Sequence, residues 1–268
     1  MIKILTLNWN GLDKLKQLTP SVIQAMEGLD WQWWIRDHAS SDGSKEYLES
    51  ITNDNIKPIF YHTNRENFSQ GMNYLFDQAN PADNDYILLL NNDTMIHNHN
   101  SIKNMIDCMT DDIGIVGAKI LFPSTNKIAH AGVIFCNKKN NMPWHYKAGE
   151  QATEAENKNR YFQAVTAACL LTTAKIYREA GKLYTGYMWS FEDISYCMTV
   201  KYKLNKQIIY CGNSLIYHDE SSTLKKNPVN KLFMQQNVDL FRKQWSGIYQ
   251  IDHQLYLDNP NYGLFPIR

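Results

Sequence analysis

Four short polar segments of the chain combine residue types that can bind a metal ion or move a proton. They are Asp37 through Ser44, Asn91-Asn92-Asp93, Glu192-Asp193 and Tyr217-His218. Carboxylate oxygens are the preferred ligands of Mg²⁺ and Mn²⁺, and neutral imidazole also binds Mn²⁺. A carboxylate near a reacting hydroxyl can accept its proton as a general base. These segments could therefore bind a nucleotide, hold a metal on its phosphates and activate an acceptor hydroxyl.

Asp37 and Asp93 each follow an apolar run that is typical of a strand. Asp37 can accept a hydrogen bond from a nucleobase imide or a ribose hydroxyl. Asp93 is a lone carboxylate that can ligate a metal, with Asn91 placing a phosphate or ribose. Both segments also have an ordinary structural interpretation, because Asp-Gly-Ser turns and polar caps before helices are common. For each segment taken alone, that alternative stays open.

Glu192, Asp193 and His218 lie in the second half of the chain. We predict that Asp193 is a general base and that Glu192 binds or orients an acceptor. The alternative is that the two acids cap the following helix, whose N-terminus favours negative charge. His218 ends a predicted strand and is either a late metal ligand or, as is commoner for a lone histidine, a core or surface side chain.

Short strand-like runs alternate with helical patterns through about residue 120. The predicted strands are Ile2–Leu7, Trp31–Arg36, Lys57–His62 and Tyr86–Leu90, and the predicted helices are Leu12–Met26, Ser44–Thr52 and Gly71–Ala79. The last strand shows no polar alternation, as expected when both faces of a parallel strand are buried. This order predicts an α/β doubly wound sheet, whose ligands bind at the carboxyl ends of the strands. The polar segments Asn8–Gly11, Asp37–Ser44 and Asn91–Thr94 fall at such ends.

The second half is less regular. Asn137–Arg160 is polar and lacks a clear period, so we predict a mobile loop that acts as a lid or as an acceptor loop, with Trp144, His145 and Tyr146 as its bulky anchors. Helices are predicted over Ile194–Leu204 and Lys231–Trp245, and strands over Gln207–Tyr210 and Leu215–Tyr217. No repeat or Gly/Pro linker divides the chain, so we expect one domain over residues 1–225 and a helical tail over 226–268 packed on it.

Composition limits the class of protein. Lys plus Arg equals Asp plus Glu at 27 each, so no overall field favours a nucleic acid partner. Hydrophobic residues make up 44% of the 268 residues, which is enough for a core. The five cysteines are scattered without CxxC spacing, which indicates reduced thiols in a cytoplasmic protein. No apolar run is long enough to span a bilayer, so we expect at most peripheral contact with the inner face of the membrane.

In their order and spacing, these motifs resemble the family 2 inverting glycosyltransferases with the GT-A fold, in the rhamnosyltransferase-like branch. Leu7-Asn8-Trp9-Asn10-Gly11 is similar to the family's first nucleotide loop, and Asp37 through Ser44 to its Asp-Asn-x-Ser-x-Asp-Gly-Ser turn. Asn64 through Asn73 is similar to its Asn-x-Gly-Phe-x-x-Gly-x-Asn segment, and Asn91-Asn92-Asp93 stands at its Asp-x-Asp site. The pattern is completed by His130-Ala131-Gly132-Val133, Thr166 through Leu171, Glu192-Asp193, and His218 with Ser221 and Ser222.

The resemblance implies a Rossmann-like mixed sheet flanked by helices and a metal-dependent hexosyltransferase. It implies that Asp93 and His218 hold Mn²⁺ or Mg²⁺ and that Asp193 is the base, with Glu192 beside it. The residues implied in donor binding are Thr6, Asn8, Asn10, Asp37, Asn64, Gly71, Asn73, Asn91 and Asn92. We expect a UDP- or dTDP-sugar donor, and as acceptor a hydroxyl of a saccharide or lipid-linked saccharide in a growing surface glycan, with inversion of the anomeric configuration.

Other functions fit the motifs less well. A nucleotidyltransferase would need a Gly-rich phosphate loop after the first strand, and a dinucleotide-dependent oxidoreductase would need G-x-G-x-x-G; neither motif is present. A nucleotide-sugar-binding pseudoenzyme or lectin-like module stays open as the alternative from another class. The pair Glu192 and Asp193 favours an enzyme, and hydrolysis of the donor would distinguish the two.

Overall fold

A parallel strand–helix alternation forms the first half of the chain, as predicted. The computed structural model describes residues 1–63, 66–188, 190–219 and 229–265. The elements of this half are β1 (Ile2–Asn8), α1 (Leu12–Ala25), β2 (Trp31–His38), α2 (Ser44–Ser50), β3 (Ile56–Tyr61), α3 (Phe68–Ala79) and β4 (Tyr86–Leu90). Because β1 pairs in parallel with both β2 and β4, the carboxyl ends of these strands meet at one edge of the sheet.

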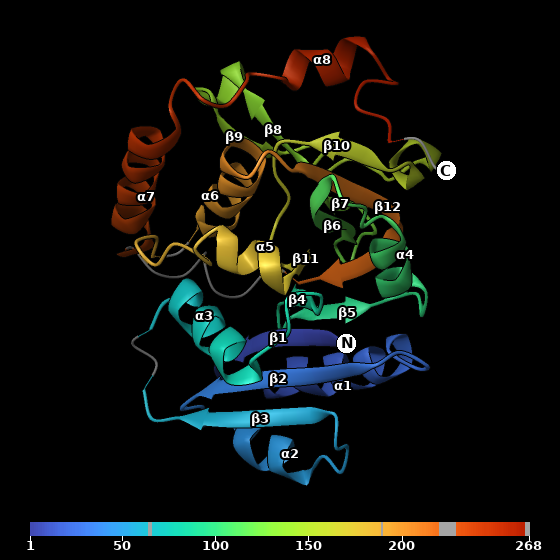
Figure 1. Ribbon diagram of the computed structural model, residues 1–268, viewed down its shortest axis with the longest axis vertical. Helices are drawn as coiled ribbons and strands as arrows, with labels where there is room; N and C mark the ends of the chain where they lie inside the picture. The colour runs from blue at the N-terminus through green and yellow to red at the C-terminus, as the bar shows by residue number, and fades with distance from the viewer. Residues whose placement is uncertain (64–65, 189, 220–228, 266–268) are drawn as a thin grey trace.

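The second half adds strands to the same sheet. Its strands are β5 (Thr94–Ile96), β6 (Ile113–Leu121), β7 (Ile128–His130), β8 (Val133–Cys136), β9 (Met142–His145), β10 (Arg160–Phe162), β11 (Cys169–Thr173) and β12 (Gln207–His218). Its α-helices are α4 (Ser101–Asp107), α5 (Ala174–Glu179), α6 (Glu192–Met198), α7 (Val229–Trp245) and α8 (His253–Asp258). The sheet order is β10-β12-β6-β11-β4-β1-β2-β3, with β11 antiparallel between β4 and β6. Helices flank this mixed sheet (Figure 1), which confirms the predicted α/β fold.

Two apolar layers cover the two faces of the sheet. Successive residues of β4 alternate between them: Ile87 and Leu89 pack in one layer, and Leu88 and Leu90 in the other. All four side chains are fully buried. Burial on both faces is therefore the reason why this strand carries no polar residue in alternation.

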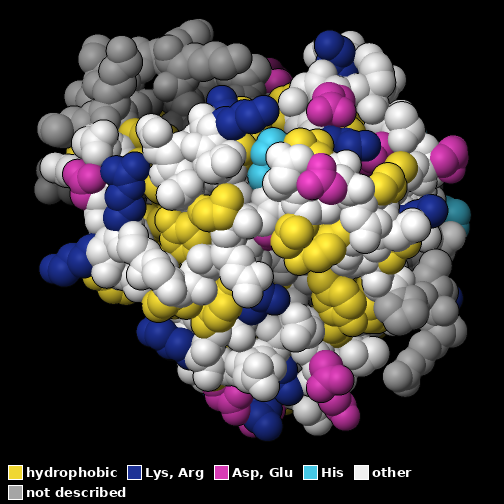
Figure 2. Space-filling model, turned by 90° about the horizontal axis from the view of Figure 1, so that it is seen from above, with side chains coloured by type: hydrophobic (Ala, Val, Ile, Leu, Met, Phe, Trp, Pro, Cys, Tyr) yellow, Lys and Arg dark blue, Asp and Glu magenta, His cyan; other side chains and the backbone are white. Residues whose placement is uncertain are grey.

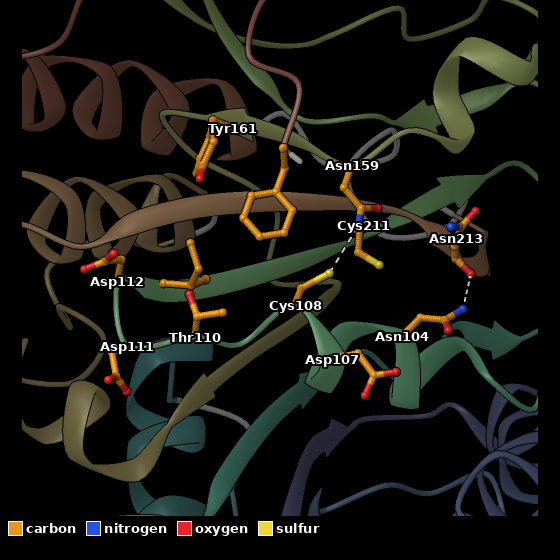
Figure 3. Close-up of a pocket in the computed structure, with 12 residues that line it drawn as sticks. Asn104, Asp107, Cys108, Thr110, Asp111, Asp112, Asn159, Tyr161, Cys211 and Asn213 are labelled. Atoms are coloured by element: carbon orange, nitrogen blue, oxygen red, sulfur yellow. Dashed lines mark hydrogen bonds between the residues drawn. The ribbon is translucent and has the colours of Figure 1, made fainter. Parts of the chain in front are cut away.

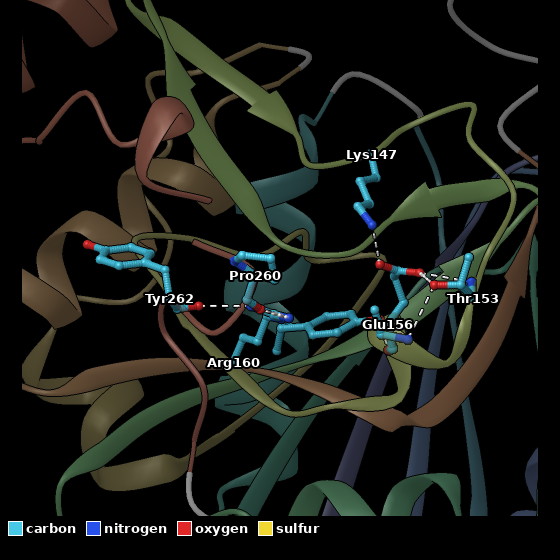
Figure 4. A network of polar contacts seen from close by, with 8 residues as sticks. Lys147, Thr153, Glu156, Arg160, Pro260 and Tyr262 are labelled. Carbon is cyan, nitrogen blue, oxygen red and sulfur yellow. Dashed lines mark hydrogen bonds and ion pairs between the residues drawn. The ribbon is translucent and has the colours of Figure 1, made fainter. Parts of the chain in front are cut away.

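The segment Asn137–Arg160 is more regular than predicted. β9 pairs with β8 as an antiparallel hairpin. Farther along, the buried carboxylate of Glu156 accepts hydrogen bonds from Lys147 Nζ at 2.6 Å and from Thr153 N–H at 2.8 Å (Figure 4). The prediction of an irregular loop was wrong for these stretches, because a polar composition does not reveal which charged side chains become buried in pairs.

One strand, β12, runs where two were predicted. Gly212-Asn213-Ser214 looks like a turn in the sequence, but it forms an irregularity inside the strand, where the register shifts between Cys211 and Leu215. A side chain at Gly212 would clash with the backbone of Asn157. The continuous strand carries His218 to a pairing with Thr94, the residue after Asp93.

The C-terminal tail packs on the body of the protein. Phe241 and Trp245 of α7 are buried, and the Trp245 indole N–H donates to Ser195 Oγ of α6 at 3.0 Å. Arg160 donates to the backbone carbonyls of Pro260 and Tyr262 (Figure 4). The expected boundary between residues 225 and 226 lies outside the described residues.

Charged and apolar side chains are interspersed over the face seen from above (Figure 2). Both charge signs occur there, in keeping with the equal numbers of basic and acidic residues in the whole chain, 27 each. Within the described ranges, no helix combines the length and the apolarity needed to cross a membrane.

Candidate active site

Asn8 links the ends of three parallel strands. From the end of β1, its Nδ2 donates to Asp37 Oδ1 of β2 at 2.8 Å. Its Oδ1 accepts from Asn92 Nδ2, just beyond β4, at 2.7 Å. The side chain is 1% exposed and uses its donor and its acceptor within the protein, so it holds the three strand ends in register.

The two loops at this edge are also bonded to each other. Asp37 is buried, and its Oδ1 and Oδ2 accept from the hydroxyl and the backbone N–H of Ser40 at 2.6 and 3.0 Å. Asn10 donates its backbone N–H to Ser40 Oγ at 2.8 Å and accepts from Ser41 N–H with Oδ1 at 2.8 Å. Asp42 accepts from the backbone N–H of Leu12, at the start of α1, at 2.9 Å. The loops Asn8–Gly11 and Asp37–Ser44 thus form one preorganised surface.

Trp9 stands on this surface with 49% of its area exposed. The predicted loop included Trp9, but no feature of the local sequence distinguished Trp9 as a binding residue. Gly11 is buried beside it, and a Cβ at Gly11 would collide with the amides of Asn8 and Asn92. The close approach of these two amides therefore requires glycine at position 11.

Asp93 and His218 are 125 residues apart in sequence and meet at the same edge. His218 Nε2 lies 2.9 Å from Asp93 Oδ1, and Lys14 Nζ of α1 lies 3.6 Å from Asp93 Oδ2. Burial alone would raise the pKa of Asp93, but the hydrogen bond and charge of His218 and the charge of Lys14 outweigh it and lower the pKa. Asp93 and His218, the two predicted metal ligands, thus lie within hydrogen-bonding distance of each other.

The distance between Asp93 and His218 is that of a hydrogen bond, and it also matches the spacing of two neighbouring ligands of a divalent cation. Adjacent ligands of an octahedral ion with bonds of about 2.1 Å lie about 3 Å apart, and the oxygen and nitrogen here are 2.9 Å apart. Among the described residues, no group of three or more His, Cys, Asp or Glu side chains forms a ready metal site. A cation at Asp93 and His218 would therefore take its remaining ligands from phosphate oxygens and water.

Glu192 and Asp193 begin α6 in different environments. Asp193 accepts from Ala167 N–H with Oδ2 at 3.1 Å and from Ile194 N–H with Oδ1 at 2.8 Å. Glu192 Oε2 is enclosed and has no hydrogen-bond partner in the described part of the chain. Burial, followed by the nearby charge of Asp193, raises the pKa of Glu192 to about 8. At neutral pH, Glu192 therefore carries a proton, and it can serve as a hydrogen-bond donor.

His130, at the end of β7, contacts the β8–β9 hairpin. Its Nδ1 lies 3.2 Å from Nδ1 of His145, and its Nε2 accepts from the backbone N–H of Gly132 at 3.3 Å. Burial, and then the charges of His145 and His218, lower the pKa of His130 well below its ordinary value. His130 is thus a neutral, buried side chain that contacts β9 from the end of β7.

Three other predicted donor-binding residues make contacts inside the protein, and a fourth is not described. Thr6 is fully buried, and its hydroxyl accepts from the Trp33 indole at 2.8 Å, so it belongs to the core rather than to the surface of the site. Gly71 allows α3 to approach Leu7 closely. Asn73 binds the backbone of Leu183 with both its Nδ2 and its Oδ1. Asn64 lies outside the described residues.

Two cavities differ in their position relative to the predicted site residues. One of about 240 Å³ lies beside Asp93 and is also lined by Lys14, Gln17, Tyr217 and Asp219, among others. Another of about 730 Å³ is lined by residues that include Cys108, Ile113, Asn159 and Cys211 (Figure 3). Ile113 starts β6, whereas Asp93 lies beside the end of β12, so the larger cavity is away from the predicted site residues.

Solved structures with similar folds include a mannosyltransferase and proteins in complex with nucleotides or nucleotide sugars. The mannosyltransferase PcManGT from Pyrobaculum calidifontis, in complex with GDP-Man and Mn²⁺, has a TM-score of 0.63 at 11% identity, covering 96% of this chain and 69% of that one. S. aureus TarS 1-349 in complex with UDP-GlcNAc has a TM-score of 0.60 at 14% identity, covering 94% and 69%. GalNAc-T7 with UDP, GalNAc and Mn²⁺ has a TM-score of 0.62 at 14% identity, covering 99% of this chain, which spans 55% of that chain's length. These likenesses establish the GT-A type of fold.

The comparison with curated proteins finds no match. The family model described as Glycosyl transferase family 2 matches residues 4–166, a range that spans most of β1 and all of β2 through β10 and includes Asp37 and Asp93. This match covers more than half of the chain. The chain therefore belongs to glycosyl transferase family 2.

Proposed function

We propose that this glycosyltransferase moves a sugar from a UDP- or dTDP-sugar to a hydroxyl of a saccharide or lipid-linked saccharide, with a divalent metal and with inversion. The observation that carries the proposal is the meeting of Asp93 and His218 at 2.9 Å, beside the two interlocked loops. These residues come from distant parts of the chain, and their donor atoms suit a cation that binds diphosphate. The rhamnosyltransferase-like branch and a place in surface glycan synthesis belong to the same proposal.

The nucleotide is proposed to lie over the loops Asn8–Gly11 and Asp37–Ser44. The exposed ring of Trp9 offers a flat face for stacking on the base. Asp37 Oδ2 already accepts from Ser40 N–H and has a second lone pair for an imide N–H of uracil or thymine. Trp9→Ala should weaken UDP binding more than Trp9→Phe, because only the latter keeps an aromatic face.

Asp93 and His218 are proposed to hold Mn²⁺ or Mg²⁺. The cation would neutralise charge that develops on the diphosphate as it leaves. The role of the protein is to present a carboxylate and an imidazole side by side at the sheet edge, with Asn91 and Asn92 in the same loop. PcManGT and GalNAc-T7 are described with Mn²⁺, which supports a divalent ion here.

Asp193 is proposed as the base that takes the proton of the acceptor hydroxyl. The backbone N–H groups of Ala167 and Ile194 hold its carboxylate in place, and each oxygen can accept another hydrogen bond. Protonated Glu192 would donate to an acceptor oxygen. One base and direct attack by the acceptor predict a single displacement at the anomeric carbon, and hence inversion.

Two experiments in sequence test the proposal. A thermal-shift screen of nucleotide sugars with Mn²⁺ should identify one donor, because a ligand at 100 times its Kd stabilises the fold by about 2.7 kcal/mol. NMR coupling constants of the product then report its anomeric configuration. Retention would refute the single displacement, and donor binding without turnover or hydrolysis would indicate a nucleotide-sugar-binding pseudoenzyme or lectin-like module. Fractionation of cells would test the proposed cytoplasmic location and peripheral contact with the inner face of the membrane.

A further inference from the structure

Asp93 is contacted by a positively charged side chain as well as by His218. Lys14, in the first turn of α1, places Nζ 3.6 Å from Asp93 Oδ2, while His218 Nε2 lies 2.9 Å from Oδ1. The Lys14 side chain is 29% exposed and that of Asp93 is 14% exposed. The two carboxylate oxygens are therefore shared between a lysine and a histidine.

This arrangement affects the charge available to a cation. One ammonium and one carboxylate cancel, so the Lys14–Asp93 pair offers no net negative charge. An ammonium beside the carboxylate also repels a divalent cation, and the repulsion is stronger at a partly buried site than in water. A metal ion and the ammonium of Lys14 therefore compete for Asp93.

Lys14 also has the means to move. Its ammonium is a compact charge on a flexible four-carbon stem. The cavity of about 240 Å³ beside Asp93 is lined by Lys14 itself, together with Gln17, Tyr217 and Asp219. This space would receive the ammonium without rearrangement of α1.

In the proposed reaction, the diphosphate of the donor is a second anionic partner for the Lys14 ammonium. The leaving nucleoside diphosphate gains a negative charge as the bond to the sugar breaks, and one divalent ion does not neutralise the whole product. The loop Asn91-Asn92-Asp93 contains a single carboxylate, so it contributes one protein anion to the metal. A second, mobile cation on the diphosphate would complete the compensation of charge.

We propose that Lys14 is a catalytic residue that exchanges partners, pairing with Asp93 in the free protein and with the donor diphosphate once a metal ion binds Asp93. This proposal rests on the proposed glycosyltransferase function and adds to it a residue outside the recognised motifs. It makes two predictions of opposite sign. Loss of the ammonium should strengthen metal binding to the free protein and weaken nucleotide binding to the metal-loaded protein.

The experiment compares Lys14→Met with Lys16→Met and Lys14→Arg. Lys16 lies two residues along α1, is exposed, and faces away from residue 14 on a helix, so it is the matched control. Electron paramagnetic resonance measures the Kd for Mn²⁺ without nucleotide, and calorimetry measures the Kd for UDP at saturating Mn²⁺. For Lys14→Met we expect Mn²⁺ to bind several-fold tighter and UDP about tenfold weaker, as for loss of a charged hydrogen bond. Lys14→Arg should restore most of the UDP affinity, and Lys16→Met should match the wild type.

If Lys14→Met leaves either the Kd for Mn²⁺ or the Kd for UDP unchanged, the proposed exchange of partners by Lys14 is refuted. Unchanged or weaker Mn²⁺ binding would show that Lys14 does not compete for Asp93, and unchanged UDP binding would show that it does not reach the diphosphate. If Lys16→Met weakens UDP binding as much as Lys14→Met does, the effect comes from general surface charge, and the proposal is also refuted. If the wild type itself binds neither Mn²⁺ nor UDP, the proposed function fails, and this outcome is distinct from wild-type binding that Lys14→Met leaves unaltered.

Discussion

The carboxylate of Asp193 accepts a hydrogen bond from the backbone N–H of Ala167 at 3.1 Å. The carbonyl of the next residue, Ala168, accepts from the backbone N–H of Asn91 at 3.0 Å. Through these two bonds the start of α6 is tied to the loop that carries Asp93. The proposed base and the proposed metal ligand are therefore held by one short stretch of backbone before β11.

Asp193→Asn tests the base. The amide keeps the shape of the side chain and one acceptor oxygen, but it cannot take up a proton. Since general-base catalysis contributes about 10² to 10⁴ in rate, turnover should fall by that order while the Kd for UDP stays nearly unchanged. Steady-state kinetics and calorimetry measure the two quantities. Turnover close to that of the wild type would show that Asp193 is only a helix cap.

Glu192→Gln tests the raised pKa of Glu192 through stability. Between its ordinary pKa of 4.5 and the value of about 8 in the folded protein, the unfolded chain loses this proton while the folded protein keeps it. The unfolded state then binds fewer protons, so this group lowers stability as pH rises through that window. Glutamine cannot ionise, so Glu192→Gln should gain stability over the wild type from pH 4.5 to about 8, by on the order of a few kcal/mol.

Urea unfolding at several pH values measures this difference, and Glu179→Gln is a suitable control. Glu179 is exposed in α5, where a carboxylate stays hydrated in the folded protein. Its variant should show little dependence of the stability difference on pH. A flat difference for Glu192→Gln as well would mean that Glu192 is ionised in the folded protein.

His218→Gln separates metal binding from structure. Glutamine can still donate to Asp93, whereas alanine would remove the 2.9 Å contact altogether and leave the carboxylate with one fewer partner. We expect the Mn²⁺ concentration for half-maximal activity to rise about tenfold or more, with a metal-free Tm within a few degrees of the wild type. An unchanged metal requirement together with a lower metal-free Tm would make His218 a structural residue.

Limited trypsin digestion tests the predicted lid. Lys138 and Lys139 are exposed at the end of the β8–β9 hairpin, whereas Lys147 farther along is only partly exposed and is paired with the buried Glu156. Cleavage should therefore occur after residues 138 and 139 in the free protein, and it should slow when UDP-sugar and Mn²⁺ are bound. Equal rates in both states would argue against closure of this hairpin over the site.

The α/β alternation and the edge where ligands bind could be predicted from local patterns. A strand such as Tyr86–Leu90, buried on both faces, must be apolar throughout, and polar residues directly after parallel strands must gather at one edge. The order of polar motifs then indicated the family. None of these inferences required a contact between distant residues.

The partners of individual side chains depended on tertiary structure. Asp37 and Asn8 are bound to each other within a buried network, Thr6 faces a tryptophan in the core, and Glu192 is enclosed beside Asp193. Nothing in the local sequence distinguishes such groups from exposed ones, because burial and pKa are set by segments that pack from elsewhere.

The contacts of Lys14 and His218 with the two oxygens of Asp93 also depended partly on local sequence and partly on tertiary structure. The sequence alone determined that a carboxylate would follow β4 and that a histidine would end a late strand. Only the fold decided that β12 runs on past Gly212 without a break and that α1 turns Lys14 toward Asp93. The reason is physical: spacing along the chain sets which residues end an element, whereas the packing of elements sets which ends meet.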